Sequence, residues 1–330
     1  YTTGLELKKP VMPGRGINFK AKYWADFIQH HRYDNQDRTD HTVNALLDGL
    51  FAQHIVLRIN ENYKKTADPP NDELTDLEKR LRNNTKTALG LKTRKLGLEV
   101  EYQYVRDNYD TLNTLDKDEN VVAPTLLFYI SPKTSLFAEY KIGQIEYDVN
   151  TTNNDSEYIQ VNGGLRGRLA PKLVGIIKGG YKETDYEDTR TVTERDFKGG
   201  TVYGNVIYDI KENSTLAVYG EREVVESTFQ TNNYYVSKKI GAQLDFKLLQ
   251  RIFVFGGGRT GSNDYPENIT VGSVTDKRSD DISEANAGLR YMIGKSIVLQ
   301  GSYDYRKKDS NFNAYDYKNN IYSGKISLLF

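Results

Sequence analysis

The chain ends with the stretch Tyr322-Ser323-Gly324-Lys325-Ile326-Ser327-Leu328-Leu329-Phe330, whose residues alternate in character. Read with a period of two, one face carries Tyr322, Gly324, Ile326, Leu328 and Phe330, and the other carries Ser323, Lys325 and Ser327. Successive side chains of a β-strand point to opposite faces, so one face suits lipid and the other suits water. An alternating strand that stops on an aromatic residue is typical of the last strand of a bacterial outer-membrane barrel.

The bulk composition is unusual for a soluble domain of 330 residues. Tyr and Gly are abundant, at 25 and 27 residues, while hydrophobic residues make up only 38% of the chain and the mean hydropathy is −0.66. The longest apolar runs, such as 173–177 and 252–255, are much shorter than the ~20 residues that a membrane helix needs. A transmembrane barrel accounts for this composition, because each strand needs only every second residue to be apolar.

Charge and motif content exclude several classes of function. Lys+Arg and Asp+Glu are both 45, and a net charge of zero argues against a nucleic-acid partner. The absence of cysteine excludes disulfides, zinc–thiolate sites and thiol nucleophiles. The sequence has no Gly-x-Ser-x-Gly, no phosphate-binding loop and no HExxH, so we predict no enzyme, no catalytic residue and no cofactor.

The histidines and the acidic runs are the candidate metal ligands of this sequence. His30, His31 and His41 lie near Asp34, Asp37 and Asp40, but adjacent His30 and His31 point to opposite faces of a strand. Acidic runs such as Asp280-Asp281 are interpreted as solvated loops. We therefore predict no metal site.

Segments of about ten alternating residues repeat along the chain. Short connections such as 131–134 and 170–172 alternate with long polar connections such as 66–83 and 262–280. This asymmetry is typical of periplasmic turns and extracellular loops, and it places both termini on the periplasmic side. We predict a single all-β, up-and-down antiparallel transmembrane β-barrel of about 16 strands, near 15–33, 41–51, 55–65, 84–92, 96–107, 119–130, 135–147, 157–169, 172–183, 197–209, 214–226, 234–248, 251–261, 282–293, 296–307 and 314–330.

The alternation assigns a face to each residue. In 240–248, for example, Ile240, Leu244 and Phe246 oppose Gln243 and Asp245. The strand 251–261 is ambiguous, because Phe253 and Phe255 compete with Ile252 and Val254 for the lipid.

Aromatic residues end many of the predicted apolar faces. Such rings favour the boundary between lipid and water, because one end is apolar and the other can hydrogen-bond. We predict two membrane girdles formed by Phe27, Phe51, Tyr104, Phe128, Tyr181, Tyr208, Phe246, Tyr291, Tyr305 and Phe330.

The opposite faces are polar and carry both signs of charge. So many charges in a dry core would cost a large desolvation energy, so we expect water inside the barrel. Either these residues line a permeation path or they form cross-strand ion pairs that fill and stiffen the wall. The predicted pore-lining residues are Lys20, Lys22, Asp26, Arg58, Glu99, Glu101, Glu139, Lys141, Arg166, Arg168, Lys178, Asp245, Arg290, Asp304 and Arg306. The aromatic residues predicted to face inward are Trp24, Tyr129, Phe137, Tyr158 and Tyr203. We expect these rings to pack within the protein in preference to binding sugars.

Residues 1–14 fall outside the strand pattern, since Pro10 and Pro13 interrupt it. We expect a periplasmic N-terminal segment or a tail inserted into the lumen, followed by the barrel over 15–330. Because the chain starts at Tyr1, we also expect that it has been processed or truncated.

Two hairpins carry a resemblance to a known family. The segments 126–140, with Ser131-Pro132-Lys133-Thr134 at the turn, and 163–173, with Ala170-Pro171-Lys172 at the turn, are similar to the putative β-barrel porins. The resemblance covers the chain from about residue 15 to the end. It rests on the general sequence character of the hairpins and not on invariant residues. It implies an outer-membrane protein associated with exopolysaccharide export. The final strand also resembles the signal read by the barrel-assembly machinery, although Gly324 sits one position earlier than the usual glycine.

We therefore predict a channel in the bacterial outer membrane that conducts passively, for an exported polysaccharide or for small solutes. The alternative is a structural barrel that anchors or sheathes a partner, such as a surface assembly or an electron-transfer cytochrome. The partners expected are outer-membrane lipid, the barrel-assembly machinery, and a polysaccharide-export or periplasmic protein, with no nucleic acid.

Overall fold

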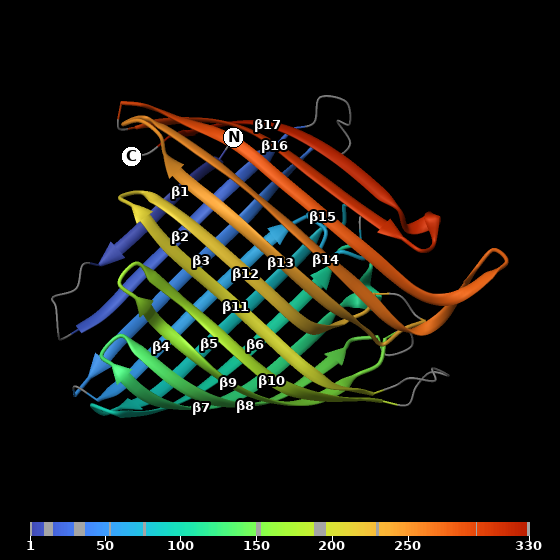
Figure 1. Ribbon diagram of the computed structural model, residues 1–330, viewed down its shortest axis with the longest axis horizontal. Helices are drawn as coiled ribbons and strands as arrows, with labels where there is room; N and C mark the ends of the chain where they lie inside the picture. Colours follow the sequence, from blue (N-terminus) through green and yellow to red (C-terminus); the bar gives the residue numbers. More distant parts are fainter. Residues whose placement is uncertain are drawn as a thin grey trace. The chain divides into compact units, whose positions relative to one another are not determined.

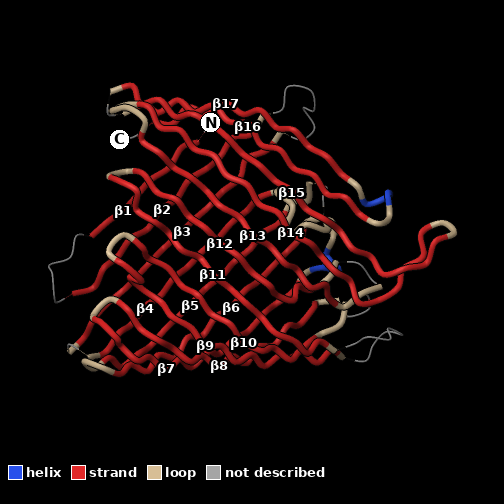
Figure 2. The backbone as a smooth tube through the Cα atoms, in the orientation of Figure 1, coloured by secondary structure: helices blue, strands red, loops and turns tan. Residues whose placement is uncertain are grey.

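The computed structural model describes residues 2–9, 16–29, 37–52, 54–74, 77–149, 153–187, 196–228, 231–294 and 296–328. Most of the residues in these ranges are in β-strands, and the same ranges contain two single 3₁₀ turns, at Asn113–Leu115 and Asn313–Tyr315 (Figure 2). Within the described ranges, no helix has the length and apolar character to cross a membrane.

In the described part of the chain, seventeen strands follow one another (Figure 1). They are β1 (Thr2–Lys9), β2 (Gly16–Ile28), β3 (Arg38–Phe51), β4 (Ile55–Thr66), β5 (Arg80–Lys92), β6 (Leu96–Tyr109), β7 (Lys117–Ser131), β8 (Thr134–Tyr147), β9 (Ser156–Ala170), β10 (Leu173–Tyr186), β11 (Phe197–Lys211), β12 (Ser214–Glu226), β13 (Tyr234–Lys247), β14 (Ile252–Val271), β15 (Val274–Ile293), β16 (Ile297–Ser310) and β17 (Tyr317–Leu328). All sixteen predicted strands are present as β2 to β17, each shifted by a few residues at most except in the β14–β15 hairpin.

The chain divides into two compact units, which are described separately. The first comprises residues 1–161 and 183–191, and the second comprises residues 162–182 and 192–330. In the first unit, each of β1 to β7 pairs antiparallel with the next strand. In the second, each of β11 to β16 does the same. Both units are up-and-down meanders, as the alternation predicted.

The registers give each unit two distinct faces. Residues directly opposite each other in a ladder lie on the same face of the sheet. Thus Leu244 is opposite Leu216 on β12 and Gly256 on β14, while Asp245 is opposite Thr215 and Phe255. We call the face that bears the charged residues the charged face and the other the apolar face.

The register resolves the one ambiguous strand. Phe253 is directly opposite Arg290, and Phe255 is opposite Asp245, so both rings lie on the charged face. Val254 is opposite Phe246 and belongs to the apolar face.

The β14–β15 hairpin differs from the prediction. The stretch 262–280 was expected to be a loop, but β14 and β15 continue as paired strands to a tight turn at 272–273, where Gly272 has φ of 65°. The ladder is irregular between Asp264 and Asn268, and Pro266 lies in this irregular part. Proline is tolerated there because its missing N–H removes no ladder bond.

The N-terminal segment also differs. Residues 1–14 were placed outside the strands, yet Thr2–Lys9 forms β1 and pairs with Phe19–Asp26 of β2. Pro10 and Pro13 lie outside the described residues. Whether this segment is periplasmic or lies in the lumen stays a prediction.

The neighbouring strands β10 and β11 approach each other closely at Gly175, and this approach allows a test of the fold. A Cβ added at Gly175 would collide with the backbone carbonyl of Asn205, whereas one added at Gly301 would meet no atom within 4 Å. Gly175→Ala should lower the free energy of unfolding by about 1–3 kcal/mol through overpacking. Gly301→Ala, the matched control, should be neutral or raise it by up to ~1 kcal/mol. Urea unfolding in detergent measures both, and equal values would contradict the register.

Candidate pore wall and membrane-facing surface

The charged face of the first unit is built from cross-strand ion pairs. Asp48 on β3 is directly opposite Arg58 on β4, and a carboxylate oxygen of Asp48 lies 3.4 Å from Nε of Arg58. Lys86 and Glu101 approach to 3.8 Å across β5 and β6. Glu139 and Lys141 approach to 3.9 Å along β8. Each positive charge in these pairs is therefore balanced locally.

The charged face of the second unit repeats this arrangement. Arg290 on β15 forms an ion pair with Asp245 on β13 and lies over the ring of Phe255, 4.7 Å from its centroid. Farther along the same face, Glu284 pairs with Arg259 at 2.8 Å and with Arg306 at 4.0 Å. Phe255 therefore lies on the strand between the two strands that carry this ion pair, and its ring packs against the guanidinium of Arg290.

The ladders place most of the predicted pore-lining residues on these faces. In the first unit they are Lys20, Lys22, Asp26, Arg58, Glu99, Glu101, Glu139 and Lys141, and in the second they are Asp245, Arg290, Asp304 and Arg306. Arg166 and Arg168 are on β9 and Lys178 is on β10. Sharing a face agrees with a common role, and lining of a pore stays a prediction.

One part of the charged face is apolar, which the sequence analysis did not predict. Val121, Ile145, Tyr147 and Tyr158 form a buried hydrophobic cluster in the first unit. The hydroxyl of Tyr158 donates a hydrogen bond to Glu119 at 2.9 Å. The wall is therefore not uniformly polar, and this patch excludes water locally.

Rings on the charged face lie over glycines of a neighbouring strand. A Cβ added at Gly143 would collide with the ring of Tyr158, and one at Gly241 would collide with the ring of Tyr219. A Cβ at Gly288 would likewise collide with Phe255. Such ring-over-glycine pairs keep a bulky side chain flat against the sheet and cover exposed backbone.

The predicted inward aromatic residues follow this pattern in part. Tyr129 packs against Gly97 and receives the ammonium group of Lys92 at 4.9 Å from its ring centroid. Phe137 is buried opposite Leu127. Trp24 and Tyr203 also lie on the charged face, opposite Thr42 and Glu221. Tyr129, Phe137 and Tyr158 therefore pack against the wall, which is the role that the sequence analysis preferred to sugar binding.

The extended β14–β15 hairpin holds a buried charge cluster. The guanidinium of Arg278 lies between the rings of Tyr265 and Tyr315, 4.7 Å and 3.9 Å from their centroids. It also pairs with Asp280 at 2.5 Å, and both side chains are almost fully buried. The expectation that Asp280-Asp281 belongs to a solvated loop is wrong for Asp280. Pairing and ring stacking offset the cost of burying this charge.

The apolar face carries the predicted girdle residues. Phe27, Phe51, Phe128, Tyr181, Tyr208 and Tyr291 are exposed there, as expected for side chains that meet lipid. Tyr104, Phe246 and Tyr305 share this face and are half-buried. Phe330 lies outside the described residues. The girdle role stays a prediction.

The apolar face also holds a carboxylate that the sequence analysis missed. Glu61 on β4 lies between Ala45 on β3 and Thr85 on β5, and it accepts a hydrogen bond of 2.5 Å from the Thr85 hydroxyl. Asn83 and Thr87 share this face of β5. Polar residues on the apolar face of β4 and β5 give no distinctive signal in the sequence, because they occur within strands that are already rich in polar residues.

The described histidines make ordinary contacts. Nδ1 of His41 is 3.0 Å from the hydroxyl of Tyr23, and Nδ1 of His54 is 3.0 Å from the carbonyl oxygen of Lys92. His30 and His31 lie outside the described residues. Among the residues that the structure does describe, three or more His, Asp or Glu side chains nowhere gather as a metal site would require.

Long antiparallel strands in sequence order, with one charged and one apolar face, are typical of transmembrane β-barrels of the bacterial outer membrane. A model of the family described as Putative beta-barrel porin 2 matches residues 18–328, and the chain belongs to this family. The fold class, the family and the outer-membrane location predicted from the sequence are confirmed. Family and fold together support an outer-membrane channel.

Two solved structures of outer-membrane proteins are similar to this chain at low identity, and the first of them shares its fold. The FrpB iron transporter from Neisseria meningitidis is 9% identical, with a TM-score of 0.50 over 100% of this chain and 64% of that one. The alcaligin outer-membrane receptor FauA from Bordetella pertussis is 12% identical, with a TM-score of 0.43 over 94% and 61%. This chain therefore spans less than two thirds of either protein. No curated protein sequence matches it.

The assigned faces can be tested by placing one charge on each. Leu244→Arg puts a guanidinium on the apolar face of β13 and should lower the free energy of unfolding by about 2–4 kcal/mol near mid-membrane. Gln243→Arg, one residue away on the charged face, should change it by less than ~1 kcal/mol. Urea titration of the protein folded in lipid vesicles measures both, and equal losses would show that the faces are wrongly assigned.

A loop contact between the residues just before β5 and those just after β6 generates a pH prediction. Burial raises the pKa of Glu78, but hydrogen bonds from the Thr111 hydroxyl and from the Thr111 and Leu112 amides, 2.7, 2.7 and 3.2 Å long, outweigh it and lower the pKa below 4.5. Because the folded pKa is depressed, the contact should be stable above pH 4.5 and be lost as the pH falls through the folded pKa.

The amide resonance of Thr111, followed by NMR in detergent, should therefore move with a midpoint below pH 4.5. Glu78→Gln should remove this transition, because an amide does not titrate. A midpoint above 4.5, or a transition that survives in the variant, would contradict the assignment.

Proposed function

We propose that this protein is a passive, water-filled conduit through the outer membrane with weak ion selectivity. The observation that supports the proposal is the pairing of opposite charges along the charged face, as in Asp48–Arg58, Asp245–Arg290 and Arg259–Glu284. Numerous charges need water around them. A wall whose charges are balanced favours neither cations nor anions strongly.

The cargo we propose first is an exported polysaccharide, with small polar solutes as the second candidate. A neutral polymer would meet a wall whose charges are largely compensated and whose rings, such as Tyr129 and Tyr219, lie flat. The family resemblance favours the same cargo. We infer no enzymatic step, because the charged face offers paired ions and packed rings in place of an activated nucleophile.

A structural barrel is the alternative. Val121, Ile145, Tyr147 and Tyr158 already pack against one another and are almost fully buried on a face otherwise built for water. A barrel whose interior is packed in this way would be closed to solutes and would serve to anchor or sheathe a partner protein. In either case we propose that β17 (Tyr317–Leu328) is read by the barrel-assembly machinery during insertion.

Conductance across planar bilayers tests the proposal. The purified protein should give steady conductance steps, a reversal potential close to zero in a KCl gradient, and transient current blocks when neutral dextran is added. A barrel that sheathes a partner should give no steps after the partner is removed, or should remain closed throughout, and that result would reject the conduit.

The charge pairs predict a specific change in selectivity. Asp245→Asn leaves Arg290 without its carboxylate, so the reversal potential should move toward anion preference. Asp281→Asn removes the same charge from the apolar face of β15 and should leave the reversal potential unchanged. If both variants behave as the parent protein does, Asp245 does not line the conduction path.

A further inference from the structure

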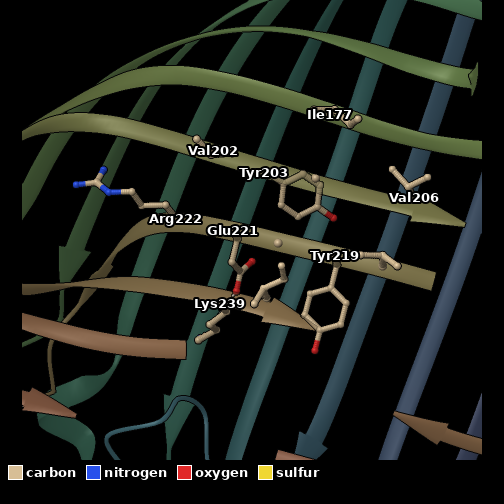
Figure 3. Close-up of a pocket in the computed structure, with 12 residues that line it drawn as sticks. Ile177, Val202, Tyr203, Val206, Tyr219, Glu221, Arg222 and Lys239 are labelled. Atoms are coloured by element: carbon tan, nitrogen blue, oxygen red, sulfur yellow. Dashed lines mark ion pairs between the residues drawn. The ribbon is translucent and has the colours of Figure 1, made fainter. Parts of the chain in front are cut away.

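The apolar face of the second unit contains a groove over β10 to β13 (Figure 3). Its volume is about 400 Å³, within the range of small-molecule sites. The side chains that wall it on this face are Ile177, Val202, Val206, Val218 and Ile240. Four of them, Ile177, Val202, Val218 and Ile240, are 43–59% exposed, so the groove opens away from the sheet.

A pair of glycines forms the floor of the groove. Gly204 on β11 is directly opposite Gly220 on β12. A Cβ at Gly204 would meet no atom within 4 Å, and one at Gly220 would come no closer than 3.6 Å to its nearest neighbour. The two missing side chains therefore leave a depression that neighbouring residues do not fill. Apolar walls around an unfilled floor suit a flexible hydrocarbon chain.

Positive charge borders one end of the groove. Arg222 lines it from β12, and Lys238 is directly opposite Arg222 on β13. The Arg222 guanidinium donates a hydrogen bond to the carbonyl oxygen of Gly200, which uses one of its five N–H donors. Lys238 pairs with Asp264 at 2.8 Å. Two cations against one carboxylate leave a net positive charge at this rim.

Arg222 also occupies a girdle position. The girdle residues Tyr104, Tyr181 and Tyr305 are each the ninth residue of an outward-running strand, β6, β10 and β16, and Arg222 is the ninth residue of β12. The strand geometry thus brings its guanidinium to the level of the outer lipid headgroups. An arginine at this level binds phosphate more strongly than an aromatic ring could.

We propose that this groove binds a phosphate-bearing lipid of the outer leaflet, with an acyl chain over Gly204 and Gly220 and a phosphate on Arg222. The apolar walls bury methylene groups, each worth about 0.8 kcal/mol, and the arginine supplies charge-assisted hydrogen bonds. A second copy of the chain fits less well, because a two-fold contact centred on the groove would bring Arg222 against the same residue of its partner.

Native mass spectrometry of the full chain in detergent tests the proposal, with bisphosphorylated lipid A as the probe and phosphatidylethanolamine as the comparison lipid. Lipid A should form a one-to-one adduct. Gly204→Leu fills the groove and Arg222→Gln removes the phosphate partner, so each should weaken the adduct by about tenfold or more. Gly301→Leu is the matched control, because Gly301 is also open and opposite Gly324 on the apolar face but has no such rim.

Circular dichroism and heat-dependent migration in gels establish that each variant is folded before the comparison. Loss of the lipid A adduct in both groove variants but not in the control supports the site. Adducts that persist in both groove variants, or that fall equally in the control, overturn it. A dimer of the parent protein that Gly204→Leu abolishes, without any lipid adduct, would assign the groove to a second copy and also overturn the proposal.

Discussion

Inside a bilayer no water is available to hydrogen-bond the peptide groups, so every N–H and C=O of a spanning strand needs a partner on its neighbour. The ladders of this chain meet that requirement over long, regular stretches, as between β12 and β13, where pairing runs unbroken from Thr215–Asp245 to Glu226–Tyr234. A fixed ladder in turn fixes the face of every side chain, since a slip of one residue would exchange lipid and water faces. The arrangement of charges, rings and glycines on both faces follows from this constraint.

The same alternation of side chains along the strands has different effects on the charged face and on the apolar face. On the charged face, ion pairs such as Arg259–Glu284 and rings laid over glycines such as Gly241 compensate charge and cover backbone without filling space. On the apolar face, paired glycines such as Gly204 and Gly220 leave a depression, because the outward side chains next to them do not close over it. Glycine therefore has opposite effects on the two faces, and which effect occurs depends on whether a ring from the next strand reaches it.

The strands were predictable because lipid imposes a period of two, and the sixteen strands from β2 to β17 follow that period closely. The prediction failed where lipid no longer imposes it. The outer part of β14 and β15 is polar on both faces, so its sequence resembles a loop, and the burial of Arg278 and Asp280 depends on an irregularity around Pro266 that no periodicity reveals. Face assignment at Phe253 and Phe255 required the register itself, since both faces of that strand are apolar. The sequence predicts ion pairs as a class, but their partners depend on the register, which sets Arg58 opposite Asp48 and Glu284 opposite Arg259.

The β14–β15 hairpin has a mechanical consequence. The last residue of β14 that pairs with β13 is Asp264, and β14 continues for seven more residues to Val271, so the ribbon extends about 20 Å beyond that ladder. A hydrogen-bonded ribbon stiffened at its base by Arg278, Tyr265 and Tyr315 resists bending far better than a free loop does. It therefore forms a stiff projection beyond the ladder of its neighbour β13. An antibody or phage that reached this end of the strands would meet it in a single defined shape.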